Sequence, residues 1–167
     1  MGQTRLAVDL DTSIGYLLKQ AASTLRSAMD GALRPLGLTV PQYACLELLA
    51  QRPGLSNSGL ARGAFVTRQS MNVLLQGLER DGFVSRPAEP PAAGRALPAQ
   101  LTPLGRERLE VASSVVQQVE ERMRAGLDAD QQDALRALLT ACVTALNDSD
   151  SAPVSYTHLT LPTILLV

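Results

Sequence analysis

The stretch from residue 67 to residue 86 constrains the fold more than any other, because its pattern changes there from helical to strand-like. Apolar residues recur at the spacing of one face of an α-helix, namely Met71, Leu74, Leu75 and Leu78. The opposite face carries the polar residues Arg68, Gln69, Asn72 and Gln76. Gly82 follows, where a helix C-terminus favours a residue that tolerates positive φ. Arg, Gln and Asn can read base edges, so the pattern suggests a DNA-contacting helix, although a solvated surface helix is the simpler explanation of this stretch alone.

Two shorter helical patterns come directly before this stretch. Thr39 and Gln42 form a capping-box pattern, so a helix is expected to begin there. Its inward-facing residues are expected to be Tyr43, Leu46, Leu49 and Ala50. Ser56 is placed to cap a short helix that carries Leu60 and Ala61. Two short helices followed by a helix with polar residues at its N-terminal end predict a helix-turn-helix with a brace helix before it.

A two-stranded wing is predicted after these helices. Residues 83–86 read as a strand, residues 87–96 as a proline-rich loop, and residues 97–101 as a returning strand at a sheet edge. Arg95 lies near the tip of the loop. A basic tip beside a helix in the major groove is well placed to enter the adjacent minor groove.

A long amphipathic helix is predicted before this region. Thr12 or Ser13 can cap it, and its apolar stripe runs through residues 14–33 until Pro35 and Gly37 end it. A stripe this long and wide usually packs against more than one neighbour, including one in another subunit.

Two further helices are predicted after the wing. Thr102 followed by Pro103 is a helix start, and a capping-box pattern at Asp128 and Gln131 opens the last helix. Long terminal helices around a compact middle are difficult to bury within one small subunit, so we expect a homodimer held by these helices. The expected fold is mainly α with a small β-wing, a winged helix-turn-helix with long N- and C-terminal dimerisation helices.

These patterns divide the chain into four parts. They are an N-terminal dimerisation helix at 1–37, a winged helix-turn-helix lobe at 38–102, C-terminal dimerisation helices at 103–147, and a tail at 148–167. Residues 155–167 contain no acidic residue, Lys or Arg and have strong β character, so they resemble vector read-through and are left out of the fold prediction. The alternative is a genuine hydrophobic tail that docks on the dimer.

Charge is distributed unevenly along the chain, although the net charge is −1. Basic and acidic side chains number four and four in residues 1–51, eight and four in residues 52–108, and three and eight in residues 109–167. The basic middle suggests a nucleic-acid contact surface. Fourteen of the fifteen basic residues are Arg, which forms forked contacts with phosphate and guanine.

Catalysis finds little support in the residue pattern. The single histidine, His158, lies in the tail, and no Gly-rich phosphate loop, HExxH motif or spaced Cys/His set occurs. Cys45 and Cys142 lie in apolar stretches and are expected to fill space rather than react. We therefore expect no enzyme activity, no cofactor and no metal site. Without a signal pattern or a long apolar run, we expect a cytoplasmic protein with no membrane contact.

Several short motifs occur in an order and spacing that are specific together. They are Leu38-Thr39-x-x-Gln42, Leu60-Ala61, LERDGFVSR at residues 78–86, Arg95, and LTPLG at residues 101–105. Over roughly residues 12–147 the chain resembles the MarR family of bacterial winged helix-turn-helix regulators. The resemblance implies a homodimer that binds palindromic double-stranded DNA operators, and in many members a repressor released by phenolic or other small apolar effectors.

The resemblance also implies residue roles. It assigns the N-terminal part of the recognition helix to Thr67, Arg68, Gln69, Ser70 and Asn72, and a minor-groove contact to Arg95. Within the basic middle, Arg62, Arg86 and Arg106 are expected to contact phosphates. Tyr16 and Tyr43 either line an effector pocket or are core tyrosines with a hydroxyl at the boundary.

Two departures from the family pattern qualify these roles. Ala93 stands where the family usually has Asp, two residues before the wing arginine, so an ion pair that would stiffen the wing is missing. No cysteine occurs between Thr12 and Leu33, which argues against the peroxide-sensing mode. The expected function is a DNA-binding regulator, and the alternative is a winged-helix module that binds protein and no operator.

Overall fold

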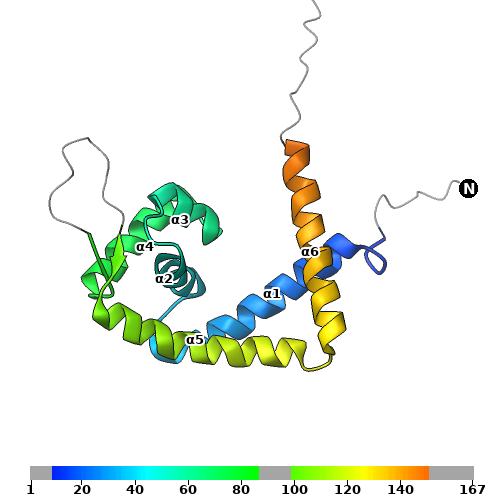
Figure 1. Cartoon of the computed structure of the whole chain (residues 1–167), viewed down its shortest axis with the longest axis horizontal. Helices are drawn as coiled ribbons and strands as arrows, with labels where there is room; N and C mark the ends of the chain where they lie inside the picture. Colours follow the sequence, from blue (N-terminus) through cyan, green and yellow to red (C-terminus); the bar gives the residue numbers. More distant parts are fainter. Residues whose placement is uncertain (1–8, 87–98, 151–167) are drawn as a thin grey trace, which may run out of the picture. The chain divides into compact units, whose positions relative to one another are not determined.

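The computed structural model describes residues 9–86 and 99–150, with side chains to residue 148. Its elements in chain order are α1 (Ile14–Leu33), the 3-10 helix η1 (Arg34–Leu36), α2 (Val40–Gln51), α3 (Asn57–Gly63), α4 (Arg68–Arg80), β1 (Val84–Ser85), β2 (Gln100–Leu101), α5 (Pro103–Arg124) and α6 (Ala129–Asp150). The fold is mainly helical with a two-stranded sheet, which confirms the predicted class (Figure 1). The chain divides into two units, Met1–Ala125 and Gly126–Val167, and each is described by itself.

Side-chain caps begin the helices where the sequence predicts them. The hydroxyl of Ser13 accepts a hydrogen bond from the Tyr16 amide at the start of α1. Thr39 and Gln42 form the predicted capping box at the start of α2. The remaining predicted starts are confirmed in the same way, with capping residues Ser56, Thr102 and Asp128. Thr67 caps α4, a role that was not predicted. Each cap satisfies backbone N–H groups that the first helical turn leaves free, so the helix boundaries are set locally.

The apolar core of the first unit lies between α2, α3, α4 and the parts of α1 and α5 that pack against them. Its most deeply buried side chains are Leu33, Cys45, Leu46, Leu60, Met71 and Leu78. The predicted inward faces of the short helices are therefore confirmed, with one exception. Ala50 is exposed, because the buried face of α2 at the end of the helix is formed by Cys45 and Leu49, and Ala50 lies beside that face.

The wing base connects α4 to α5. Gly82 has φ 78°, the left-handed conformation that ends α4. Antiparallel pairing then joins β1 to β2, with Val84 opposite Leu101, and both side chains are buried. The loop that contains Ala93, Arg95 and Pro98 lies outside the described residues, as do His158 and the rest of the segment from 151 to 167.

One hydroxyl holds the wing base against the start of α5. Thr102 Oγ1 accepts a hydrogen bond from the Gly105 amide at 3.0 Å and donates one to the Gly82 carbonyl at 2.6 Å. The approach is so close that a Cβ on Gly105 would lie 2.0 Å from the carbonyl oxygen of Phe83. Glycine at position 105 therefore allows α5 to begin directly against the wing.

The long helices expose much of their apolar surface. In the first unit, α1 packs along α5, yet Ile14 and Leu17 of α1 are 72% and 64% exposed (Figure 1). Considered by itself, α6 carries Leu138 and Leu146 at 66% and 73% exposure. Within residues 9–86 and 99–150, no helix is both long enough and apolar enough to cross a membrane.

Candidate nucleic-acid interface

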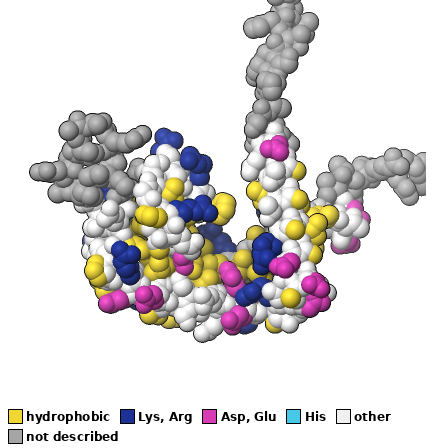
Figure 2. Space-filling view, viewed as in Figure 1, with side chains coloured by type: hydrophobic (Ala, Val, Ile, Leu, Met, Phe, Trp, Pro, Cys, Tyr) yellow, Lys and Arg dark blue, Asp and Glu magenta, His cyan; other side chains and the backbone are white. Residues whose placement is uncertain are grey.

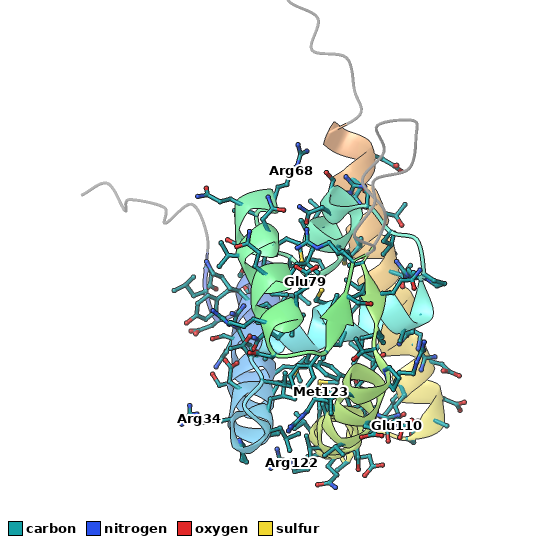
Figure 3. The ribbon with its side chains drawn as sticks, turned by 90° about the vertical axis from the view of Figure 1, so that its left-hand side faces the viewer. Arg34, Arg68, Glu79, Glu110, Arg122 and Met123 are labelled. Atoms are coloured by element: carbon teal, nitrogen blue, oxygen red, sulfur yellow. The ribbon has the colours of Figure 1, made fainter. Side chains whose placement is uncertain are left out.

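The N-terminal end of α4 carries exposed polar side chains, while the opposite face of the helix is buried in the core. Met71, Leu75 and Leu78 anchor the helix in the core, whereas Arg68 and Gln69 are exposed. Figure 3 shows the Arg68 side chain extending away from the ribbon at this end of α4. An exposed guanidinium and amide on a fixed helix end have the reach and the donors to contact base edges.

Thr67 and Ser70 shape the start of α4. The Ser70 amide donates to Thr67 Oγ1 at 3.0 Å, and the two hydroxyl oxygens lie 2.8 Å apart. Both residues are exposed, so a partner can still reach them. Their first task is nevertheless to hold the helix terminus that carries Arg68 and Gln69.

Asn72 is engaged by a residue of the preceding helix. The Asn57 side-chain amide donates a hydrogen bond to Asn72 Oδ1, which connects α3 to α4. This leaves the exposed amide nitrogen of Asn72 as the group that it can offer to a ligand. The sequence did not predict this pair, because the two residues are fifteen positions apart and belong to different helices.

The three arginines predicted to contact phosphates differ in their surroundings. Arg62 at the end of α3 and Arg106 in the first turns of α5 are exposed. Arg86 instead forms a forked ion pair with Glu79, with Nε 2.6 Å from Oε1 and Nη2 2.9 Å from Oε2. This pair ties the last turn of α4 to the first wing strand, which leaves Arg86 less available to phosphate than the other two.

Basic side chains gather on one side of the α3 and α4 region. Figure 2 shows dark-blue side chains over the outer part of these two helices. Arg108 is not among the free cations, because its Nη1 donates to the Leu36 carbonyl at 3.1 Å and its guanidinium stacks 5.3 Å from the centre of the Phe83 ring. The exposed arginines, including Arg62 and Arg68, therefore give this surface the charge that a phosphate backbone requires.

A polar network joins α2 to α5 on another side of the unit. Tyr43 and Ser113 both donate to Glu47 Oε1, at 2.9 Å and 2.6 Å, and Gln51 donates to Glu47 Oε2 at 2.7 Å. Burial acts to raise the pKa of the Glu47 carboxyl, but these hydrogen bonds outweigh it and hold the pKa below its usual value. Burial also raises the pKa of Tyr43 to about 12, so its hydroxyl stays protonated and keeps donating.

The role of Glu47 in joining α2 to α5 was not predicted from the sequence. The spacing of Tyr43, Glu47 and Gln51 was a readable signal, because residues four apart face each other on a helix. The contact to Ser113 had no such signal. Tyr16 is about half exposed and lines a hollow with Leu10, Thr12 and Gln20 that does not include Tyr43.

The two cysteines have different surroundings. Cys45 is fully buried, and burial raises the pKa of its thiol to about 12, as expected for a residue that fills the core. Cys142 on α6 is exposed in the single chain, so its expected role of filling space at the dimer seam stays a prediction. No group of His, Cys, Asp and Glu among the described residues is arranged to hold a metal ion.

Comparisons with known proteins agree on one family. A model of the MarR family matches residues 36–96. The HTH-type transcriptional repressor Rv2887 of Mycobacterium tuberculosis is 46% identical over 129 residues, which cover 77% of this chain and 92% of that protein. The family-model match spans α2, α3, α4 and the first wing strand.

Solved structures of that mycobacterial protein superpose on this fold. Its complex with salicylic acid has a TM-score of 0.67 at 44% identity, covering 82% of this chain and 99% of the other. Its complex with DNA has a TM-score of 0.66 at 42% identity, covering 79% and 98%. The winged helix-turn-helix is therefore shared over nearly the whole length of the related chain.

Proposed function

The chain belongs to the MarR family, and we propose that it is a transcriptional repressor that binds a palindromic DNA operator as a homodimer. The observation that carries the proposal is the exposed Arg68–Gln69 pair at the N-terminal end of α4, held by the buried Met71. The related repressor, 42% identical in its DNA complex, supports the same assignment. One α4 per subunit would enter successive major grooves, with half-sites about one helical turn apart.

Each proposed contact has a separate task. Arg68 and Gln69 would read bases, with Asn72 assisting through its free amide nitrogen. Arg62 and Arg106 would bind phosphates and supply the salt-dependent part of the affinity. Arg95 in the wing would enter the minor groove, as the family pattern implies. Arg86 would act chiefly through Glu79, by fixing the wing relative to α4.

The dimer follows from uncovered apolar surface. The exposed stripe of α1 around Ile14 and Leu17, and that of α6 around Leu138 and Leu146, would be buried against the partner subunit. We therefore propose residues 1–37 and 103–147 as dimerisation segments and residues 38–102 as the DNA-binding lobe, with 148–167 as a tail. The proposed location is the cytoplasm, and no enzymatic activity is proposed.

An aromatic acid is the proposed effector class. The related repressor has been solved with salicylic acid, and the family resemblance implies phenolic effectors for many members. Tyr16 and Tyr43 remain candidates for contacting it, but Tyr43 already donates its hydroxyl to Glu47. Sodium salicylate should weaken DNA binding by the full chain. If DNA binds equally well with and without salicylate, the effector class is wrong and the DNA-binding role is unaffected.

The DNA-binding role is tested with duplexes that the full chain selects from a random pool. Binding is measured by gel shift at low and high salt for the wild type, Arg68→Ala and Arg34→Ala. Arg34 is an exposed arginine that Figure 3 places far from Arg68, so it serves as the matched control. Arg68→Ala should weaken the free energy of DNA binding by about 1–3 kcal/mol and relax the preference for one base.

Two results would contradict the proposal at different levels. Equal weakening on every sequence would make Arg68 a phosphate contact rather than a base reader. Failure of the wild type to bind any duplex at any salt would favour the alternative, a winged-helix module that binds protein.

A further inference from the structure

Phe65, in the turn between α3 and α4, has an unusual position for a large apolar residue. Its side chain is 94% exposed, more than any other large apolar side chain in the part of the chain that the structure describes. Its backbone φ is 55°, a left-handed value that no other non-glycine residue among residues 9–86 and 99–150 adopts. Both properties disfavour phenylalanine in a free, folded protomer.

The turn that holds Phe65 is well anchored. The Phe65 amide donates to the Arg62 carbonyl at 3.3 Å, and the next amide, of Val66, donates to the Ala61 carbonyl at 3.0 Å. Ala64 is buried on one side of Phe65, and Val66 packs against the core on the other. The backbone is therefore fixed by its neighbours, and the ring is presented to solvent without adding apolar burial to the fold.

The charges around Phe65 indicate what could cover it. Arg62 precedes it in the last turn of α3, and Arg68 follows it in the first turn of α4, both exposed. Phe65 also lies two residues before Thr67, the cap of the helix proposed to enter the major groove. An exposed apolar ring that is flanked in sequence by two exposed arginines is suited to a polyanion that also has apolar C–H surface, and duplex DNA is such a partner.

We propose that Phe65 is a DNA-contacting residue whose ring packs on the apolar C–H surface of the duplex at the rim of the major groove. This inference rests on the proposed DNA-binding function. The surface is either a deoxyribose face or a thymine methyl group. Burying an aromatic ring against either surface removes apolar area from water and so favours binding. The ring neutralises no phosphate, so it contributes affinity that does not depend on salt, unlike Arg62.

The test separates DNA affinity from folding by using glycine. Phe65→Gly removes the ring and tolerates the positive φ, whereas Phe65→Ala removes the ring and keeps the backbone conflict. Val111→Ala is the matched control, because Val111 is an exposed apolar residue of α5, 52% exposed. Binding to the selected duplex is measured across a salt series, and thermal unfolding is measured for each variant.

Phe65→Gly should weaken DNA binding roughly three- to tenfold, with an unchanged slope of affinity against salt and a melting temperature no lower than that of the wild type. Val111→Ala should leave DNA affinity unchanged. Wild-type affinity in Phe65→Gly, or a weakening accompanied by a fall in melting temperature, would overturn the inference and assign the ring a folding role. A reduced salt slope would overturn it as well.

Replacing thymidine by deoxyuridine in the duplex distinguishes the two apolar sources. If the wild type loses affinity at one thymine and Phe65→Gly does not, the ring contacts that methyl group. If both proteins ignore every replacement while the glycine variant stays weaker, the ring contacts deoxyribose. Wild-type binding is measured first, so failure of the proposed function is seen as no binding at all. Failure of this inference alone is seen as equal binding by the wild type and the variant.

Discussion

The compact lobe and the long helices use the same amphipathic pattern with opposite results. In α2 to α4 the apolar positions are covered, and Leu46, Met71 and Leu78 have no measurable exposure. In α1 and α6 the same kind of stripe remains largely open, with Leu17 at 64% and Leu138 at 66% exposure. An apolar stripe therefore establishes that a helix forms and which face is to be buried, but it does not say which chain buries it.

This difference separates two kinds of stability. The lobe is stabilised by contacts within one chain, so its stability does not depend on protein concentration. The stripes of α1 and α6 can contribute only when a partner covers them, so their contribution rises with concentration. Substitutions in the two regions should therefore differ in whether their effect on stability depends on protein concentration.

Gly105→Ala should have the largest effect, because the new methyl group meets the backbone of Phe83 rather than a movable side chain. We expect a loss of about 4–5 kcal/mol in the free energy of unfolding, since either α5 or the wing base must shift. Urea unfolding followed by circular dichroism measures it. A loss below about 1 kcal/mol would show that the wing is free to move away from α5.

Matched leucine truncations test the comparison directly. Leu46→Ala in the lobe should cost about 2–4 kcal/mol at any protein concentration, because it leaves a cavity in the core. Leu17→Ala should change the unfolding of the isolated protomer by less than about 0.5 kcal/mol but weaken self-association. Unfolding at several protein concentrations and analytical ultracentrifugation supply the two readouts. If both variants lose the same free energy of unfolding at every protein concentration, the lobe and the long helices do not differ in how they are stabilised.

Glu47→Gln should have an intermediate and pH-dependent effect. The folded protein lowers the pKa of Glu47, so its charged form contributes stability above the unfolded pKa of about 4.3 and loses it as the pH falls through the folded pKa. At pH 7 the free energy of unfolding of the variant should be about 1–2 kcal/mol lower than that of the wild type. The reason is that hydrogen bonds to a charged acceptor are replaced by weaker ones.

The difference in the free energy of unfolding between wild type and Glu47→Gln should become smaller as the pH falls below about 4. Denaturant unfolding between pH 7 and pH 3 measures it, with Glu110→Gln on the exposed surface of α5 as the control. A constant difference across this range would assign the loss to packing rather than to charge.

Gly77→Ala should have the smallest effect and the opposite sign. A Cβ at this position of α4 would meet only the end of the Arg80 side chain, at 3.6 Å. Alanine should therefore raise the free energy of unfolding by about 0.5–1 kcal/mol through helix propensity. Thermal unfolding measures the gain, and the contrast with Gly105→Ala tests whether backbone contact decides the sign. A destabilised variant would indicate a tighter contact at Gly77 than the structure has.

Local patterns made most of the fold predictable. Each helix start depends on a cap and an amide three residues later, as with Thr39 and Gln42, so a short window of sequence contains the whole interaction. The apolar periodicity of α4 and the left-handed Gly82 are local in the same sense. The family resemblance added residue roles, such as the minor-groove contact expected of Arg95.

Contacts between distant residues explain what the sequence analysis missed. Ser113 reaches Glu47 across 66 positions, and Asn57 of α3 reaches Asn72 of α4 across 15. Such pairs depend on packing angles that no short window contains. The positive φ of Phe65 was missed for a different reason, because the local turn holds a phenylalanine in a conformation that its side chain disfavours.

The double hydrogen bond of Thr102 has a mechanical consequence. Its single oxygen is both the first anchor of α5 and the tether of the Gly82 carbonyl at the end of α4. The Thr102 amide adds a second link, because it donates to the Phe83 carbonyl at 3.1 Å. A tilt of α5 about its start would therefore displace the end of α4 and the wing base together.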